Sequence, residues 1–382
     1  RRVSVPFTAH DTNKRLFRWL RGACRDPFFA WVHYWEPHMP YVPPAPFDRT
    51  YYDGDPHDAR HTSMSGVALG WFLYDLDGVR HRLAERARDV RSLKRDLGLR
   101  SADVRQLVLY RQGVKTYAPT EEAEATLRAR LAGLGDHLRS RLPFRRHLAD
   151  WLTGVRDLRF AVAQYAGEVS YVDEELGRLI DGLVRLGLQE RTIVVVTADH
   201  GESLGEHGIY FDHAGLHEPS LRVPLIVWAP GRVPPGRRGG VARGLDVAPT
   251  VLRLAGLGIP PDMQGRDILT AGEGSGPVIS EAARGLQIMA MDGPWKLIRT
   301  LQSFYYVDAF AREAGTEELY DLGTDPGEGE NVLGREAEVA QRLRGGLDTW
   351  IAAHGAGAEK PTASAPLAPE RVRELRALGY VE

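Results

Sequence analysis

The clearest periodic pattern in the chain lies between residues 161 and 187. Apolar side chains recur there every three or four positions, at Tyr165, Val169, Val172, Leu176, Leu179, Ile180 and Leu183. This spacing predicts an amphipathic helix that buries one face. Gly187 predicts its end, because glycine readily adopts the backbone conformation that terminates many helices.

Two short, continuous apolar runs follow this helix. Residues 192–198 (TIVVVTA) are rich in β-branched side chains, and residues 223–228 (VPLIVW) form a second run with proline near its start. Both predict strands covered on two faces. Asp246 could cap a helix over 248–255, which Gly256 would end. The alternation of strands and helices predicts an α/β fold with a mostly parallel sheet flanked by helices.

Further upstream, residues 27–35 (PFFAWVHYW) form an aromatic run that predicts a buried strand. The next nine residues, EPHMPYVPP, contain four prolines. Proline removes a backbone donor and restricts the residue before it, so this segment is predicted to be a rigid, extended loop that leaves the end of the strand.

The pattern changes after Gly265. Short runs at 277–281, 288–291, 295–300 and 318–322 predict a small antiparallel sheet, and residues 337–354 predict one helix. Residues 355–369, rich in Ala, Gly, Pro and Ser, predict a linker before a short helix near 370–378. We therefore divide the chain into a domain over 1–268 with a helical insertion at about 57–160, a small antiparallel α+β subdomain over 269–355, and a tail over 356–382.

Composition narrows the class of protein. The hydrophobic share of 43% and the charged share of 26% are typical of globular proteins and exclude wholesale disorder. No apolar run approaches the roughly 20 residues of a membrane-spanning helix. The single cysteine, Cys24, excludes a disulfide framework and a Cys-rich metal site. The formal net charge of −2 gives no reason to expect a nucleic-acid partner.

Charge is nevertheless uneven along the chain. Residues 77–160 contain nineteen basic and eleven acidic side chains, a net charge of +8. The leucines and valines there recur at helical spacing. Two interpretations remain open: a solvated basic face without a ligand, which such patterns usually are, or a basic rim that attracts an anionic substrate.

The residues with the most distinctive chemistry follow the strand at 192–198. Asp199 and His200 stand where this strand ends, and ligands of open α/β sheets bind beyond the carboxyl ends of strands. A carboxylate and an imidazole there are plausible metal ligands, although Asp199 could instead simply cap the next turn. His207 and His213 follow in the same loop, while His33 and His38 lie around the proline-rich loop. Loops that converge at one sheet edge can form a catalytic site.

Several ordered motifs resemble the sulfatases of the alkaline-phosphatase superfamily. They are residues 27–44, 165–173 (YAGEVSYVD), 197–208 (TADHGESLGEHG) and 218–224 (EPSLRVP), followed by 318–322 (ELYDL) with Asp325, Pro326 and Asn331, and by 375–380 (LRALGY). The resemblance spans nearly the whole chain outside residues 50–160. It implies an alkaline-phosphatase-like fold and hydrolysis of a small-molecule or carbohydrate sulfate ester.

The resemblance also implies roles for individual residues. Asp199 and His200 match two ligands of a divalent metal, most often Ca²⁺, with Mg²⁺ or Mn²⁺ as alternatives. His38 matches the histidine that assists the leaving group, and His213 matches a Lys-or-His position that holds a sulfate oxygen. These roles suit sulfuryl transfer, which needs cationic donors, a metal and an acid around a charged group.

One family feature has no counterpart. Sulfatases carry a Cys-or-Ser, any, Pro, any, Arg motif whose first residue becomes formylglycine, the nucleophile, and no such motif occurs here. In the sequence Cys24-Arg25-Asp26-Pro27, proline stands one place too late, so we interpret Cys24 as an ordinary small residue. We expect the chain, which begins Arg1-Arg2-Val3, to be truncated from a longer sequence that contains the motif and the first two metal ligands.

Two alternatives to a sulfatase remain open. One is a hydrolase of phosphate diesters or phosphonate monoesters from the same superfamily, and the other is an inactive binding protein with this fold. The sequence does not indicate an oligomeric state. By analogy with bacterial relatives, we expect a periplasmic or extracellular location.

Overall fold

The computed structural model describes residues 8–22, 27–67, 150–152, 154–270, 277–282, 285–307 and 310–355. The chain divides into two compact units. Unit 1 comprises Arg1–Thr12 and Val32–Val172, and unit 2 comprises Asn13–Trp31 and Asp173–Glu382. Two helices, α1 (Ala9–Gly22) and α6 (Leu158–Arg185), contribute residues to both units.

Unit 1 is built around the first half of α6 and the proline-rich loop. Tyr41 of this loop is almost fully buried, and its ring packs edge-on against the rings of Trp151 and Tyr165. At Gly167 on α6, a Cβ atom would lie only 2.5 Å from the Phe47 carbonyl oxygen, so glycine permits the loop to approach the helix closely. The loop has cis peptide bonds before Pro37, Pro40 and Pro46.

Three 3₁₀ helices complete the described part of unit 1: η1 (Phe47–Arg49), η2 (Ser63–Gly66) and η4 (Asp150–Leu152). The strand predicted at 27–35 is not observed. That segment is extended but has no ladder partner among the described residues, and Phe29 and Trp31 are 77% and 79% exposed. A run of apolar residues becomes a strand only where a neighbouring strand accepts its backbone hydrogen bonds.

In unit 2, the second half of α6 packs along α1. The Asn13 amide nitrogen lies 2.9 Å from both the carbonyl oxygen and a carboxylate oxygen of Glu175. The Phe17 ring occupies the space that a side chain at Gly182 would need. The amphipathic helix predicted from residue 161 is thereby confirmed.

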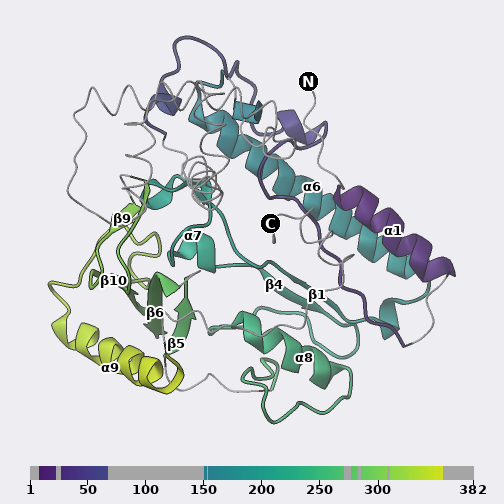
Figure 1. The fold of residues 1–382 in the computed structure, drawn as a ribbon. Coiled ribbons are helices and arrows are strands. Elements are labelled where there is room, and N and C mark those ends of the chain that lie inside the picture. Colours follow the sequence, from purple (N-terminus) through teal and green to yellow (C-terminus); the bar gives the residue numbers. More distant parts are fainter. Residues whose placement is uncertain are drawn as a thin grey trace, which may run out of the picture. The chain divides into compact units, whose positions relative to one another are not determined.

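The predicted strands at 192–198 and 223–228 are also confirmed, as β1 (Val194–Thr197) and β4 (Leu225–Trp228) (Figure 1). They pair antiparallel, with Val194 opposite Trp228 and Thr197 opposite Leu225. No parallel pair occurs among the described strands, so the predicted mostly parallel sheet is not observed there. The two strands are also not covered on both faces, since Ile226 is 55% exposed. An apolar run indicates a strand but encodes neither the direction of its partner nor what covers it. The predicted helix at 248–255 is α8 (Val247–Leu254), which follows the 3₁₀ helix η7 (Gly244–Asp246). The Asp246 carboxylate binds Arg243 and the backbone N–H of Arg266 instead of capping α8.

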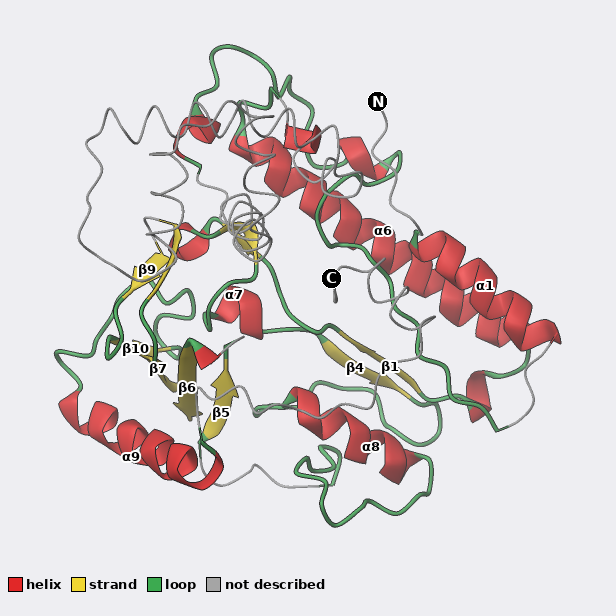
Figure 2. Cartoon of the chain, viewed as in Figure 1, coloured by secondary structure: helices red, strands yellow, loops and turns green. Residues whose placement is uncertain are grey.

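The predicted C-terminal sheet is present in full. Its strands are β5 (Val278–Glu281), β6 (Gln287–Asp292), β7 (Trp295–Thr300) and β10 (Glu317–Asp321), in the antiparallel order β10-β7-β6-β5. Helix α9 (Ala337–His354) lies against this sheet (Figure 2). Their shared core comprises Ile288, Ala290, Leu297, Leu319, Ala340, Leu343 and Leu347. Alternation in the strands and helical spacing in α9 place these side chains on facing surfaces.

Small elements join these parts of unit 2. They are η5 (Gln189–Arg191), β2 (Ser203–Leu204), η6 (Glu206–Gly208), β3 (Tyr210–Asp212), α7 (Glu218–Leu221), β8 (Phe304–Val307) and β9 (Phe310–Arg312). Residues 68–149 and 153 of the predicted helical insertion lie outside the described residues, as do Cys24, residues 356–369 of the linker and the tail helix. Within the described part of the chain, no helix is long and apolar enough to cross a membrane.

Candidate functional site

Asp199 and His200 follow directly after β1, as predicted. The backbone N–H of His200 donates to the Asp199 carboxylate at 3.1 Å. The Nδ1 atom of His200 lies 2.8 Å from the Gly201 carbonyl oxygen. Because a carbonyl oxygen can only accept, Nδ1 carries a proton and donates this hydrogen bond, while Nε2 lies 3.8 Å from an Asp199 carboxylate oxygen. A proton at Nδ1 is what a metal ligand at Nε2 requires.

Glycine is required at position 201 because the backbone of α7 approaches it closely. The Gly201 N–H donates to the Ser220 carbonyl oxygen of α7 at 2.8 Å, and a Cβ atom at this position would overlap the Pro219 carbonyl oxygen. A larger residue would have to push α7 away from the segment that carries His200. This explains, in physical terms, why glycine follows the Asp-His pair.

The structure brings His200 together with Glu202 and His213. One possible ligand atom from each of these three side chains lies within 4.8 Å of the others. The rings of His200 and His213 stack with their centroids 3.7 Å apart. The pairing of β2 with β3 explains the convergence, since Ser203 lies opposite Asp212 and the next residues outward are Glu202 and His213.

This geometry differs from the predicted site in three respects: Glu202 joins the cluster, His213 stands among the possible metal ligands, and Asp199 is not one of the three. The sequence indicated Asp199 and His200 as metal ligands and His213 as a sulfate contact, whereas Glu202 was not assigned. Its position after the Asp-His-Gly motif was visible, but only the β2–β3 hairpin shows that its carboxylate lies beside His213. Two imidazoles and one carboxylate are a donor set that fits a divalent cation. Among the described residues, this is the only cluster of three such groups close enough to share an ion.

His38 lies in unit 1. Its Nδ1 atom lies 2.7 Å from the Met39 carbonyl oxygen, and its ring packs against that of Trp35 with the centroids 4.3 Å apart. These contacts fix the orientation of the His38 ring. That His38 acts together with His213 stays a prediction.

A second group of charged side chains surrounds Lys296 of β7 and the start of α7, and no sequence pattern predicted it. Lys296 on β7 has a fully buried side chain, and its Nζ atom lies 2.9 Å from Glu218 and 2.7 Å from Glu328. His207 and His217 stack with their ring centroids 3.7 Å apart, beside Glu328 and Glu318 respectively. We call Lys296, Glu218, Glu328, His207, His217 and Glu318 the buried charge cluster.

The environment of this cluster shifts several pKa values. Burial lowers the pKa of His217, which favours the neutral ring. Burial by itself would raise the pKa of Glu328, but the contacts with His207 and Lys296 outweigh it and lower the pKa to about 2. For Glu318, the contacts with His217 and Arg312 likewise outweigh burial and lower the pKa. Both carboxylates are therefore ionised at neutral pH.

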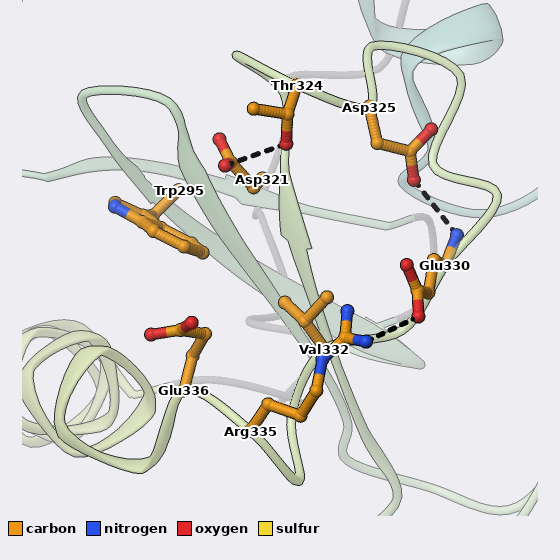
Figure 3. Close-up of a pocket in the computed structure, with 8 residues that line it drawn as sticks. All are labelled: Trp295, Asp321, Thr324, Asp325, Glu330, Val332, Arg335 and Glu336. Carbon is orange, nitrogen blue, oxygen red and sulfur yellow. Dashed lines mark hydrogen bonds and ion pairs between the residues drawn. The ribbon is translucent and has the colours of Figure 1, made fainter.

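A pocket of about 200 Å³ lies elsewhere in unit 2, lined by Trp295 of β7, Asp321 of β10 and the loop that follows β10 (Figure 3). Its acidic side chains bind neighbouring parts of the chain: Asp321 accepts from Thr324, Asp325 accepts from the Glu330 N–H, and Glu330 pairs with Arg335. These contacts organise the loop after β10. None of the three residues of the candidate metal cluster lines this pocket.

The family of this chain follows from comparison with known proteins. The family model described as Sulfatase matches residues 9–257, a segment that contains His38, Asp199, His200, Glu202 and His213. The chain belongs to the sulfatase family. The predicted resemblance is confirmed.

Among curated sulfatases, this chain is similar to the N-acetylglucosamine-6-O-sulfatase of Bacteroides thetaiotaomicron, with 33% identity over 188 residues, 47% of this chain and 33% of the relative. It is also 31% identical to the choline-sulfatase of Rhizobium meliloti over 194 residues, 48% of this chain and 34% of the relative. The matched segment thus spans about a third of the length of these relatives.

Two solved structures share the fold over most of the chain. BT4656 in complex with its substrate D-glucosamine-2-N,6-O-disulfate has a TM-score of 0.52 at 21% identity, covering 91% of this chain and 69% of that one. The phosphonate monoester hydrolase of Agrobacterium radiobacter has a TM-score of 0.50 at 20% identity, covering 91% and 61%. These likenesses show an alkaline-phosphatase-like α/β fold, in agreement with the prediction.

Proposed function

We propose that this sulfatase-family chain takes part in the hydrolysis of a sulfate ester, with a small-molecule or carbohydrate sulfate as substrate. One observation carries the proposal. Within the segment that matches the family, the fold brings His200, Glu202 and His213 into one cluster at the end of β1, next to Asp199. A sulfate ester is anionic, so a cation held by this cluster would attract and stabilise the sulfate oxygens.

The residues that would hold the cation are His200 through Nε2, Glu202 and His213, with the Asp199 carboxylate beside them. When bound, a divalent cation would supply positive charge to the sulfate oxygens as charge develops on the leaving oxygen. Calcium, the ion that the family resemblance implies most often, binds oxygen ligands almost exclusively. Because two of the three clustered donors are imidazoles, a first-row transition-metal ion suits these residues better than Ca²⁺, and Mn²⁺ is the one such ion among those that the family resemblance implies.

The proton for the departing alcohol is assigned to His38, on the family resemblance. The Nδ1 contact with Met39 orients the ring, and Nε2 would carry the transferred proton. The formylglycine nucleophile of sulfatases has no matching motif in this chain, so no residue described here is assigned that role.

The structural likeness to a phosphonate monoester hydrolase supports one alternative substrate class. Sulfate monoesters and phosphonate monoesters both present anionic oxygens on a tetrahedral centre, so the same cation site suits either. An aryl sulfate, an aryl phosphonate and a bis-aryl phosphate, supplied to the complete natural protein with Mn²⁺, separate the possibilities. Preferential turnover of the aryl sulfate supports our proposal, preference for either phosphorus ester supports the alternative, and no turnover supports an inactive binding protein.

Metal binding is tested independently on the chain itself. We expect calorimetry to show Mn²⁺ binding that is weakened by His200→Ala and by Glu202→Gln. The exposed Glu190 of η5, changed to Gln, provides a matched control. Equal Mn²⁺ affinity in wild type and both cluster variants would contradict the site.

A further inference from the structure

Glu328 lies in the loop after β10, more than a hundred residues from the candidate metal cluster in sequence, yet it contacts the segment that carries the cluster. Its side chain is fully buried. One carboxylate oxygen accepts the backbone N–H of Glu218 at 2.7 Å. Glu218 is the first residue of α7, where helix N–H groups have no partner within the helix. Glu328 thus satisfies the N-terminus of α7 from outside.

Lys296 secures this contact. Its Nζ atom lies between the Glu218 and Glu328 carboxylates, at 2.9 Å and 2.7 Å, and none of its side chain reaches solvent. A buried ammonium holds both carboxylates close together, because separating them would leave a charge uncompensated. β7 of the C-terminal sheet is therefore joined by two ion pairs to α7 and to the loop that carries Glu328.

Helix α7 passes the restraint to the metal cluster. Its Ser220 carbonyl oxygen accepts the Gly201 N–H at 2.8 Å, and Gly201 lies between His200 and Glu202. A second connection runs through His207, whose Nε2 atom lies 3.7 Å from Glu328 and which belongs to the turn between β2 and β3. Those two strands bring Glu202 and His213 together.

From these contacts we infer that Glu328, braced by Lys296, is a positioning residue for the cluster of His200, Glu202 and His213. The C-terminal sheet then sets the separation of the metal ligands through α7 and η6. The inference deepens the proposed function and rests on it for the identity of the cluster.

The experiment compares Glu328→Ala, Glu328→Gln and the control Glu330→Ala in the full chain. Glu330 lies two residues further on in the same loop, and its pair with Arg335 is exposed. Calorimetry measures the affinity for Mn²⁺ alone. Hydrogen exchange of the metal-free protein measures protection of the amides in residues 199–221 and, for reference, in β5–β7.

We expect Glu328→Ala to weaken Mn²⁺ binding about 10–100-fold, as the loss of residues that orient metal ligands typically does. Exchange should accelerate more in residues 199–221 than in β5–β7, where it should rise only as far as the loss of the Lys296 ion pair lowers the stability of the whole fold. Glu328→Gln should lie closer to wild type, because its amide oxygen can still accept the Glu218 N–H. Glu330→Ala should change neither measurement.

The inference is overturned if Glu328→Ala lowers the melting temperature but keeps wild-type Mn²⁺ affinity and wild-type exchange in residues 199–221, since Glu328 would then only stabilise the fold. If the wild-type chain binds no Mn²⁺, the proposed metal site fails, while the exchange measurement still decides whether Glu328 restrains the segment. If Glu328→Ala does not fold, Glu328→Asp replaces it, because the shorter side chain keeps the charge but withdraws the acceptor from Glu218.

Discussion

Replacing Lys296 by methionine isolates the energetic role of the buried charge cluster. Methionine keeps most of the volume and the unbranched shape of the lysine side chain, so the change removes a charge with little effect on packing. In wild type, Lys296 Nζ compensates the carboxylates of Glu218 and Glu328. In the variant, Glu328 keeps its buried position but loses the cation nearest to it.

The expected cost follows from the burial of both partners. Removing one member of a buried ion pair typically costs about 3–5 kcal/mol, because the remaining charge is left without solvent or a counter-ion. A folded domain has a free energy of unfolding of only about 5–15 kcal/mol. We therefore expect Lys296→Met to lower the free energy of unfolding by several kcal/mol at about pH 7.

The cost should depend on pH in a defined direction. The pKa of Glu328 is lowered from 4.5 to about 2 in the folded protein. A carboxyl with a lowered pKa stabilises the fold fully above its unfolded pKa and loses this contribution as the pH falls toward the folded value. Without Lys296, the pKa of Glu328 rises, so the variant neutralises this carboxyl at a higher pH than wild type does. The deficit of the variant should therefore shrink as the pH falls from about 7 to about 4.

Urea denaturation followed by tryptophan fluorescence measures both quantities. Arg342→Met is the matched control, because Arg342 pairs with Asp292 at a half-exposed position and exposed pairs contribute only about 0–1 kcal/mol. The reasoning is refuted if both variants lose the same stability at about pH 7. It is also refuted if the Lys296→Met deficit stays constant or grows as the pH falls.

Three further predictions concern other positions. Gly201→Ala should lower the free energy of unfolding by about 1–3 kcal/mol and weaken Mn²⁺ binding, because the added Cβ atom overlaps the Pro219 carbonyl oxygen. Calorimetry and thermal melts check this against the control Gly258→Ala, since nothing lies within 4 Å of a Cβ atom at that position. Burial raises the pKa of Glu168, so the stability that its protonated form contributes is lost as the pH rises through that raised pKa. Glu168→Gln should therefore raise the melting temperature more at about pH 8 than at about pH 5. An equal or opposite change would contradict this. In the complete natural protein, His38→Ala should reduce turnover of alkyl sulfates more than that of activated aryl sulfates, since good leaving groups need little protonation; equal losses would argue against an acid role.

Local sequence pattern was sufficient for elements whose partners lie close in the chain or whose periodicity is strong. The spacing of apolar residues in α6 and α9 predicted both helices, and alternation with turn residues predicted β5, β6, β7 and β10 within one or two residues. In these elements, the same side chains that define the pattern also form the buried face, so local preference and tertiary packing agree. The ordered set of motifs, which includes the one around Asp199, also indicated the family.

Relations between distant residues needed the tertiary structure. The aromatic run at 27–35 has the composition of a strand, yet a strand exists only where a neighbour pairs with its backbone, and no such pairing is observed there. Glu202 joins the metal cluster because the β2–β3 register places it beside His213, and no local spacing encodes that register. Lys296 lies in a β-strand run whose pattern marks the side chain only as polar. The side chain is buried because Glu218 and Glu328, which lie far apart in sequence, meet in the folded protein. Once packing removes their carboxylates from water, both require the same positive charge nearby.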